Sequence, residues 1–402
     1  MSPWLPVYTQ EYYPRSLRSR ACKVSRTAVI LVAVALAAII SLHSLLRHSY
    51  TEYAQITAPS NITNYFHWPT HETTTIVDVP THETWVNGTK RANAVLLMLV
   101  RNSEQEMAMN SIKELEHRFN KRYGYPWVLL NEVPFTQEFK ERISSVVAGP
   151  VTFGRIPHEH WYQPDWIDEE AATASREKMA ADGVIYGGSL SYRNMCRFNS
   201  GFFYKHPLMQ PYKWYWRVEP NVHFHCDLDY DPFLFMEQNN KVYGFTIQLT
   251  EWPMTIPTLW DAVKEFMHEN PQYLHKNNAL EFISDDKGES YNTCHFWSNF
   301  EIANMDFWRG EAYSKFFDHL ESKGGFYYER WGDAPVHSIG AALFARKDQI
   351  HWFKDIGYEH EPFQHCPLDA DVYKAQNCDC NPPSSFIYGS QCFPKWENMF
   401  KS

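Results

Sequence analysis

Hydrophobic positions beyond residue 90 alternate between continuous apolar runs and runs at helical spacing. Residues 94–100 (AVLLMLV), 126–131 (PWVLLN) and 151–156 (VTFGRI) are short runs typical of buried strands. Between them apolar residues recur every three to four positions, at Met109, Ile112, Leu115, Phe119 and Tyr123, then at Phe139, Ile143 and Val147. Ser103 with Glu106 matches a capping box, and Thr136 opens the second helix. This β-α-β-α-β order predicts an α/β fold with a Rossmann-type, nucleotide-binding half sheet.

Residues 214–219 predict a further strand, after a helical region near 192–203. Trp214, Trp216 and Val218 alternate with the more polar side chains of this run, Tyr215, Arg217 and Glu219. Pro220 removes a backbone donor and should end the strand. If the strand joins the same sheet, Arg217 and Glu219 share one face near the crevice where such sheets bind ligands.

Two acidic signals follow this strand, and each could hold a divalent metal through carboxylate oxygens. Glu219 begins the first, in Glu-Pro-Asn, and Asp227 and Asp229 form the second, in Asp-Leu-Asp. We favour Glu219, because it lies at the predicted strand end. Asp227 and Asp229 come after the proline break, where aspartates commonly cap turns.

Arg101 occupies the predicted carboxyl end of the first strand, where its guanidinium could meet a base, ribose or phosphate. An ordinary loop arginine is an equally good interpretation. The chain lacks G-x-G-x-x-G and Walker motifs, so NAD chemistry and ATP hydrolysis by those motifs are disfavoured.

Three later stretches are rich in acids, aromatics and histidines: CHFWSNFE at 294–301, FYYERWGDAPVH at 326–337 and DIGYEHEPFQHC at 355–366. A nucleotide-sugar transferase needs a metal to neutralise the diphosphate leaving group and acidic groups near the sugar. Glu219 and His360 offer an oxygen and a nitrogen ligand, a pair that suits Mn²⁺ better than Ca²⁺. Carboxylates for the sugar are offered by Glu251, Glu301 and Asp333. A lone glutamate or histidine is more often structural.

The N-terminal third predicts a membrane anchor. Residues 28–46 are apolar except for two serines and a histidine, and as a helix would span about 28 Å. Five basic residues lie between 15 and 26, which places the N-terminus in the cytosol. We therefore expect a cytosolic tail (1–27), a signal anchor (28–46), a low-complexity stalk (47–90) and one large luminal domain (91–402). A cleaved signal peptide is disfavoured, because the apolar run is long and starts late.

Seven of the eight cysteines follow the predicted anchor. In an oxidising lumen disulfides are the default, and the odd number leaves at least one thiol free or paired between chains. Zinc binding by the four cysteines from 366 to 392 is a weaker alternative, because C-x-C is not the usual zinc spacing. Asn61 and Asn87 are glycosylation acceptors if this side is luminal.

Composition narrows the function classes. Aromatic residues make up 16% of the 402 residues, which indicates a large core and flat surfaces that stack against sugars or bases. The net charge of -10 argues against nucleic acid as a partner.

The chain from about 94 to 396 resembles the fungal Golgi GDP-mannose-dependent α-1,2-mannosyltransferases, glycosyltransferase family fifteen. The matching stretches are YGYPWVLLNEVPFTQEFKERI, IYGGSLSYRNMCRFNSGFF, YWRVEP, TIPTLW, YNTCHFWSNFEIANMDFWR, GGFYYERWGDAPVHSIGAALF and DIGYEHEPFQHCPLD. The resemblance implies a GT-A-like fold, a single-pass type II protein of the Golgi membrane, and Mn²⁺ as cofactor. It also implies retaining transfer of mannose from GDP-mannose to mannosylated O- or N-linked glycans of glycoproteins.

The resemblance also assigns roles to individual residues. Glu219 and His360 correspond to the protein ligands of Mn²⁺, Glu301 to the candidate nucleophile, and Tyr192 to a residue at the reaction centre. The remaining matches to the active-site cleft are Arg217, Glu251 and Asp333. This chain departs from the family at Asn221, where members often have an aspartate, so metal or phosphate binding is expected to be weaker.

Two other classes of function compete with the transferase. A membrane-anchored lectin of the same fold would bind mannan without turnover, and a glycosidase would also use two carboxylates. Retention of Glu219, His360, Glu301 and Tyr192 argues against the lectin. The nucleotide-binding start of the domain and the predicted metal pair argue against the glycosidase.

Overall fold

The computed structural model describes residues 84–86 and 88–401. The expected cytosolic tail, anchor and most of the stalk, Asn61 and Asn87 included, lie outside the described residues. Among the helices of residues 84–86 and 88–401, none combines the length and the apolar character that a membrane span requires.

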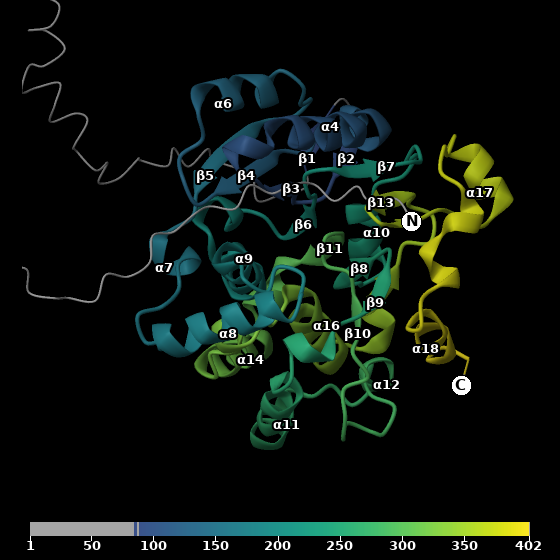
Figure 1. Ribbon diagram of the computed structural model, residues 1–402. Coiled ribbons are helices and arrows are strands. Elements are labelled where there is room, and N and C mark those ends of the chain that lie inside the picture. The colour runs from purple at the N-terminus through teal and green to yellow at the C-terminus, as the bar shows by residue number, and fades with distance from the viewer. Residues whose placement is uncertain (1–83, 87, 402) are drawn as a thin grey trace, which may run out of the picture. The chain divides into compact units, whose positions relative to one another are not determined.

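A seven-stranded mixed sheet forms the centre of the described domain (Figure 1). Its strand order is β12 (Ile350–Trp352), β8 (Tyr243–Phe245), β11 (Glu301–Asn304), β6 (Trp214–Arg217), β3 (Ala94–Leu99), β4 (Trp127–Asn131) and β5 (Val151–Arg155). β6, β3, β4 and β5 run parallel, whereas β11 is antiparallel to both β6 and β8. The predicted β-α-β-α-β start is confirmed, and so is the prediction that the strand at 214 joins the same sheet.

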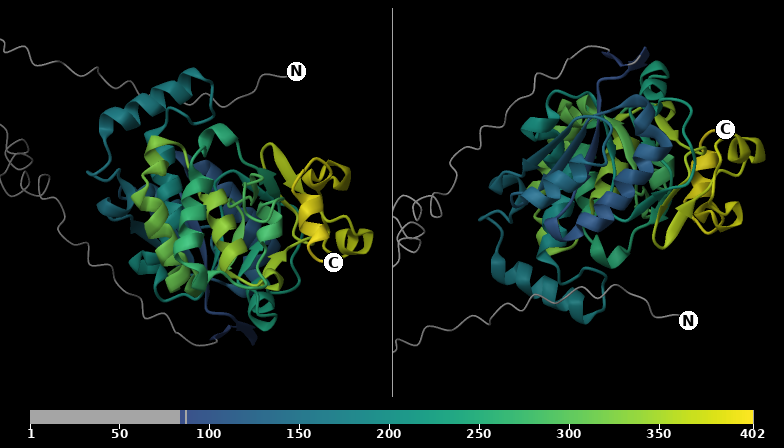
Figure 2. Two further views of the ribbon diagram at one scale, coloured as in Figure 1. Left: turned by 90° about the horizontal axis from the view of Figure 1, so that it is seen from below. Right: turned by 90° about the horizontal axis from the view of Figure 1, so that it is seen from above.

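Helices cover both faces of this sheet (Figures 1 and 2). One face packs Leu96, Met98, Trp216 and Ile302 in a core with α4 (Gln105–Leu115), η2 (Glu116–Asn120) and α6 (Gln137–Ser144). The other face packs Val95, Leu97, Tyr215 and Ala303 in a core with α9 (Leu190–Gly201), α13 (Met305–Arg309), α14 (Glu311–Ser322) and α16 (Asp333–Phe344). Further helices are α8 (Glu169–Ala181), α10 (Pro232–Gln238), α11 (Leu259–Glu269), α12 (Leu280–Ile283), α17 (Ala370–Ala375) and α18 (Phe393–Asn398). Alternate residues of each strand therefore enter opposite cores.

The two predicted helix starts have different outcomes. Thr136 caps α6 as predicted, because its hydroxyl accepts a hydrogen bond from Phe139 N at 3.2 Å. The capping box of Ser103 and Glu106 is wrong. Ser103 lies inside the 3-10 turn η1 (Asn102–Glu104), and Glu104 is the residue that reaches back, accepting from Arg101 N at 2.8 Å. The chain thus turns two residues earlier than the pattern predicts.

The strand that follows β6 along the chain belongs to a second, three-stranded sheet. Its strand order is β14 (Phe363–His365), β13 (Tyr358–His360) and β7 (Val222–Phe224). All its neighbours pair antiparallel, and His360 lies opposite Val222. The turn between β6 and β7 contains Asn221 at φ 61°, a left-handed conformation in which asparagine is enriched. The residues just after Glu219 are therefore paired with the strand that carries His360.

Six cysteines form three disulfides, which confirms disulfides and makes the zinc alternative wrong. The pairs are Cys226–Cys378, Cys294–Cys392 and Cys366–Cys380. Among the cysteines of residues 88–401, Cys196 is the free thiol, fully buried in α9. Two of the bridges fasten residues 378–380 to the ends of β7 and β14.

Two buried histidines predict that the fold loses stability in mild acid. Burial lowers the pKa of both His206 and His365 from 6.5 to about 4. The unfolded chain therefore takes up protons below pH 6.5 while the folded chain does not, so stability falls as pH drops from 6.5 toward 4. Each histidine should cost on the order of 2 kcal/mol at pH 5.

Urea unfolding at pH 7 and pH 5 measures this effect. His365→Gln should lose less stability between the two pH values than the parent protein. His268→Gln, at an exposed histidine, should behave as the parent. Equal losses in all three proteins would contradict the assignment.

Candidate active site

Arg217 lies at the carboxyl end of β6 and contacts two carboxylates. Its Nε is 2.6 Å from Glu219 Oε1, and its Nη1 is 2.5 Å from Asp333 Oδ2. In the sheet register Arg217 is opposite Glu301 on β11. Only 8% of Arg217 is exposed. The structure thus gathers three predicted carboxylates around one nearly buried guanidinium, and it confirms that Arg217 and Glu219 share a face.

Asp333 is held as an ionised carboxylate. It is the first residue of α16, where the positive end of the helix dipole favours a negative charge. Its Oδ2 also accepts a hydrogen bond from Ser298 Oγ at 2.7 Å. Burial alone would raise the pKa of Asp333, but Arg217, His337 and these hydrogen bonds outweigh it and lower the pKa.

Glu301 is fully buried, and both of its oxygens have partners. Oε2 accepts from Tyr215 Oη at 2.6 Å, and Oε1 accepts from Tyr243 Oη at 3.0 Å. His337 Nδ1 is 2.7 Å from Oε1, while His337 Nε2 is 2.9 Å from the carbonyl of Asn199. Because a carbonyl only accepts, Nε2 carries a proton. The Glu301–His337 pair therefore holds one further proton between them.

This geometry bears on the predicted role of Glu301. A nucleophilic oxygen needs an open approach to the anomeric carbon of the sugar. Here each oxygen is occupied by a tyrosine hydroxyl or an imidazole, so substrate contact would require one of these hydrogen bonds to be exchanged. The nucleophilic role stays a prediction.

Glu219 follows the end of β6, and His360 ends β13, opposite Val222 of β7. The Glu219 side chain is 20% exposed, and burial raises its pKa although Arg217 opposes this. His360 Nδ1 is buried and has no hydrogen-bond partner. Burial lowers the pKa of His360, which favours the neutral imidazole that metals bind. No hydrogen bond joins Glu219 to His360 in residues 88–401. His360 Nδ1, which has no hydrogen-bond partner, and a carboxylate three residues before Val222, the residue opposite His360, fit the predicted pair of metal ligands.

A second polar group contains the predicted residues Tyr192 and Glu251, with Arg330 between them. Arg330 Nη2 is 3.4 Å from Glu251 Oε1, and its Cζ is 5.2 Å from the centroid of the Tyr192 ring. Burial raises the pKa of Tyr192 well above its usual value, so its phenol keeps its proton. A Cβ added to Gly332 would be 3.3 Å from Glu251 Oε2. The missing side chain lets Glu251 approach the backbone next to Asp333.

Arg101 is placed at the carboxyl end of β3, as predicted. Its Nε is 3.2 Å from Glu132 Oε1, just beyond β4, and its guanidinium also donates to Ser191 Oγ. Ser191 precedes Tyr192 in α9, so Arg101 lies beside the second polar group. Its side chain is 41% exposed. Nucleotide binding by Arg101 stays a prediction.

Asp227 and Asp229 lie apart from these groups. Asp227 accepts from Arg118 Nη1 at 2.9 Å and from Asn377 Nδ2 at 3.0 Å, and Asp229 is exposed. The following helix is capped by neither of them but by Asp231, whose Oδ1 accepts from Phe233 N. The ion pair of Asp227 with Arg118 and its hydrogen bond with Asn377 thus join η2 to the segment around residue 377.

Comparisons with known proteins place the chain in a family. A family model described as glycolipid 2-alpha-mannosyltransferase matches residues 47–401. The chain belongs to this family. It is 56% identical over 308 residues to glycolipid 2-alpha-mannosyltransferase 2 of Candida albicans, covering 76% of this chain and 67% of that protein. It is 54% identical over 312 residues to alpha-1,2 mannosyltransferase KTR1 of Saccharomyces cerevisiae, covering 77% and 79%.

A solved family member shares the fold. The structure of core-mannan synthase A (CmsA/Ktr4) from Aspergillus fumigatus, in its Mn/GDP form, matches with a TM-score of 0.74 and 44% identity. The match covers 80% of this chain and 89% of that chain. The mixed α/β glycosyltransferase fold of the family is therefore confirmed for residues in the matched region.

Sequence reasoning missed several residues that contact the predicted site residues in the structure. They are Ser298, Arg330 and His337, together with the two tyrosines that donate to Glu301. Ser298 and His337 lie inside stretches singled out for their acids, and His337 follows Asp333 by four residues, one helical turn. That spacing is the one signal that could have found His337. The tyrosine contacts join residues 58 or more positions apart, which no local pattern records.

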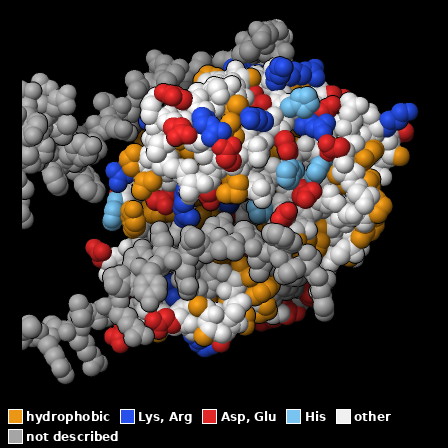
Figure 3. Space-filling view, turned by 45° about the horizontal axis from the view of Figure 1, so that its top comes forward, with side chains coloured by type: hydrophobic (Ala, Val, Ile, Leu, Met, Phe, Trp, Pro, Cys, Tyr) orange, Lys and Arg blue, Asp and Glu red, His pale blue; other side chains and the backbone are white. Residues whose placement is uncertain are grey.

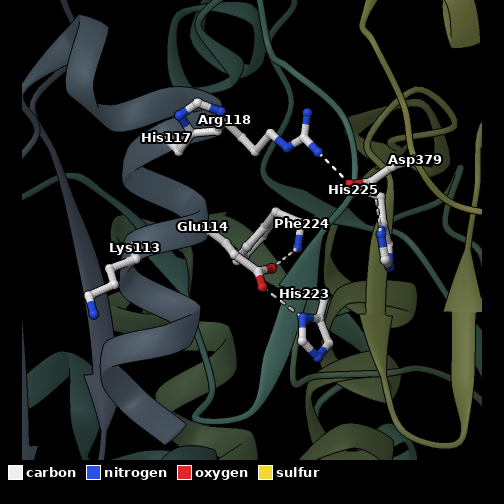
Figure 4. Close-up of a pocket in the computed structure, with 8 residues that line it drawn as sticks. All are labelled: Lys113, Glu114, His117, Arg118, His223, Phe224, His225 and Asp379. Carbon is white, nitrogen blue, oxygen red and sulfur yellow. Dashed lines mark hydrogen bonds and ion pairs between the residues drawn. The ribbon is translucent and has the colours of Figure 1, made fainter. Parts of the chain in front are cut away.

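Other polar clusters of the described region lie outside this site. Histidines gather among charged side chains on the face in Figure 3, and a cavity of about 510 Å³ is lined by Lys113, Glu114, His117, Arg118, His223, Phe224, His225 and Asp379 (Figure 4). Its acids pair with its bases, since Glu114 contacts His223 and Asp379 contacts both Arg118 and His225. Elsewhere Glu265, Glu269 and His319 are close enough to share a cation, but Lys323 Nζ lies 2.7 Å from both oxygens of Glu265.

The burial of Glu301 predicts that its charge stabilises the fold as well as the site. Glu301→Gln places an amide among three donors, and at least one donor must lose its acceptor. Breaking such a buried, charged network should cost about 3 kcal/mol of unfolding free energy. Glu219→Gln, at a partly exposed side chain with one protein partner, should cost about 1 kcal/mol. Urea unfolding measures both, and a Glu301→Gln protein as stable as the parent would show that Glu301 is not held as described.

Proposed function

We propose that this protein is a retaining α-1,2-mannosyltransferase that uses GDP-mannose as donor and mannose residues of O- or N-linked glycans as acceptor. The proposal rests on the balance of positive and negative charges around Arg217. Glu219, Asp333 and Glu301 bring three negative charges, and the guanidinium and the proton shared with His337 balance two of them. One negative charge remains, and His360 Nδ1 offers a nitrogen without a hydrogen-bond partner, a combination that favours a divalent cation.

The donor would bind at this edge of the sheet. Mn²⁺, held by Glu219 and His360, would supply the positive charge that stabilises the departing GDP diphosphate. Asn221 adds no charge to this ligand set, so metal affinity rests on those two side chains. Arg101, at the carboxyl end of β3, is positioned for the nucleotide, as strand ends in such sheets commonly are. The printed names of the relatives and the Mn/GDP form of the Aspergillus fumigatus protein support this donor and metal.

The groups around Asp333 would stabilise the charge that develops on the sugar during transfer. As mannose leaves the diphosphate, positive charge develops on its ring, and the ionised Asp333 is placed to stabilise it. Glu301 is buried more deeply than Asp333, and its carboxylate orients Tyr215, Tyr243 and His337. Retention can proceed through a covalent adduct on Glu301 or by acceptor attack from the leaving-group face. The complete hydrogen bonding of Glu301 supports the second route, in which it acts as a buried stabilising charge.

The metal assignment is tested by comparing variants of the two acidic motifs, Glu219 in one and Asp227 with Asp229 in the other. Glu219→Gln should lower mannosyl transfer by a factor of a hundred or more and raise the Mn²⁺ concentration needed, since it removes a ligand worth several kcal/mol. Asp227→Asn with Asp229→Asn should change transfer less than threefold and cost about 1 kcal/mol of stability. The measurement is transfer from GDP-mannose against Mn²⁺ concentration. Loss of Mn²⁺ dependence in the double variant, with Glu219→Gln unaffected, would reverse the assignment.

We infer a single-pass type II arrangement in the Golgi membrane, with 1–27 cytosolic, 28–46 as anchor, 47–90 as stalk and 91–402 as catalytic domain. The three disulfides support an oxidising compartment. The hairpin of β1 (Thr84–Val86) and β2 (Thr89–Arg91), at the end of the expected stalk, is joined to the catalytic domain by Arg91, whose Nη1 donates to the carbonyl of Tyr123 at 3.2 Å.

A secreted protein starting at residue 76 should therefore transfer mannose in solution, because the residues proposed for the site run from Arg101 to His360. One starting at residue 92 should melt at a lower temperature, since it loses the contacts of Arg91. Activity and thermal unfolding of the two proteins check this. A folded but inactive 76–402 protein would mean that earlier residues take part in catalysis.

A further inference from the structure

His337 is a fully buried histidine, and both of its ring nitrogens have fixed partners. Its Nε2 is 2.9 Å from the carbonyl of Asn199, and its Nδ1 is 2.7 Å from Glu301 Oε1. A carbonyl oxygen only accepts, so Nε2 carries a proton. The further proton of the pair lies either on Nδ1, giving imidazolium and carboxylate, or on Glu301, giving neutral imidazole and carboxylic acid. The groups that surround the pair favour the first of these states.

Three aromatic rings enclose the His337 imidazole. Trp308 of α13 stacks on it, with ring centroids 4.5 Å apart and planes at 22°. Tyr313 of α14 and Phe203 of η3 (Phe203–Lys205) approach it, each with a centroid distance of 6.0 Å. All three side chains are buried. An aromatic face attracts a cation within about 6 Å, most strongly at tryptophan and where water does not compete. This aromatic cage therefore favours a positively charged ring.

The hydrogen bonds of Glu301 favour its ionised form. Tyr215 Oη accepts from Trp308 Nε1 at 3.0 Å, which leaves the tyrosine proton for Glu301 Oε2. Tyr243 Oη donates to Oε1, the same oxygen that faces His337 Nδ1. With the proton on Oε1, that oxygen would be an acid hydroxyl and a poorer acceptor for Tyr243. Hydrogen bonds donated to a carboxylate stabilise its charged form.

Nearby charges act in the same direction. His337 follows Asp333 by one turn of α16. Burial raises the pKa of Asp333, but Arg217 and then His337 lower it, so Asp333 and His337 lie within electrostatic range of each other. Arg217 is opposite Glu301 in the register of β6 and β11. Moving the proton from His337 to Glu301 would remove a positive charge near Asp333 and a negative charge near Arg217, and both losses are unfavourable.

We propose that His337 is a buried imidazolium that keeps Glu301 ionised and holds its carboxylate in place for mannosyl transfer. The role in transfer rests on the proposed function, whereas the charge of the ring does not. A carboxylate stabilises positive charge that develops on the departing mannose, and a carboxylic acid does so far less. A fully buried carboxylate without a cation beside it would take up a proton. His337 acts through Glu301 and is therefore a positioning residue.

The charge of the ring is measured by solid-state NMR of the full-length protein, with histidine labelled with nitrogen-15 and glutamate with carbon-13. At pH 8 exposed histidines are neutral. The pair keeps its proton, because losing it would turn the lone pair of Nδ1 toward a carboxylate. The spectrum of the parent should contain a ring with two protonated nitrogens, one of them coupled to a glutamate carboxyl carbon, and His337→Asn should lack it.

Two results contradict the imidazolium. One is that His337→Asn removes the signals of a neutral ring, with one protonated and one unprotonated nitrogen. The other needs no variant, and so holds if His337→Asn does not fold. It is a parent spectrum without any doubly protonated ring coupled to a glutamate carboxyl carbon.

Transfer kinetics test the positioning role. His337→Asn places an amide nitrogen near the position of Nδ1, so it can still donate to Glu301 but brings no charge. We expect kcat to fall about a hundredfold and the KM for GDP-mannose to stay within about threefold, because the lost charge acts in the transition state. His319→Asn is the matched control, since His319 also contacts a backbone carbonyl, that of Ala262 at 3.0 Å, and lies outside the site. It should change neither constant.

The two measurements separate this proposal from the proposed function. A folded His337→Asn protein with the kcat of the parent overturns the positioning role. Mannosyl transfer by a parent protein whose ring is neutral overturns the imidazolium and leaves the proposed function intact. An imidazolium in a parent protein that transfers no mannose supports the charge of the ring and refutes the proposed function.

Discussion

The ion pair of Arg217 with Asp333 is the constraint on which the rest of the site depends. It joins the end of a central strand to the first residue of α16, and it brings Glu219 to the same guanidinium. An unpaired arginine in such a buried place would be severely destabilising. The fold is therefore stable only when both carboxylates stay beside Arg217, and this constraint fixes the geometry of the proposed donor site.

The buried charged groups have separate sets of hydrogen-bond partners at different depths in the protein. Glu301 lies opposite Arg217 in the register of β11 and β6, yet its own hydrogen bonds go to Tyr215, Tyr243 and His337. Both oxygens of Glu301 have donors, which is the condition under which a buried carboxylate is tolerated. Replacing any one member changes the balance for all of them, so effects of mutations here should not add.

Sequence patterns predicted the parts of this arrangement that depend on neighbours along the chain. The apolar runs at β3, β4 and β5 mark buried parallel strands, and alternation at 214–219 places Arg217 and Glu219 on one face. The pairing of Asp333 with Arg217, 116 residues away, and the enclosure of Glu301 depend on contacts between distant segments. The roles of His360 and Tyr192 were inferred by resemblance to a family. Local reasoning also failed at Ser103, where the turn η1 starts the helix earlier and gives the cap to Glu104.

The disulfide pattern has a consequence for how the protein is made. Cys226 and Cys378 are separated by 152 residues, and Cys366 is bridged to Cys380, so residues 378–380 hold the ends of both outer strands that flank β13. During synthesis the strands of the central sheet are complete at Trp352, but the strand that carries His360 gains these restraints only after Cys378 and Cys380 have been made and oxidised. The two halves of the proposed metal pair thus mature at different times. The protein would then have a folded core before its proposed metal site is complete.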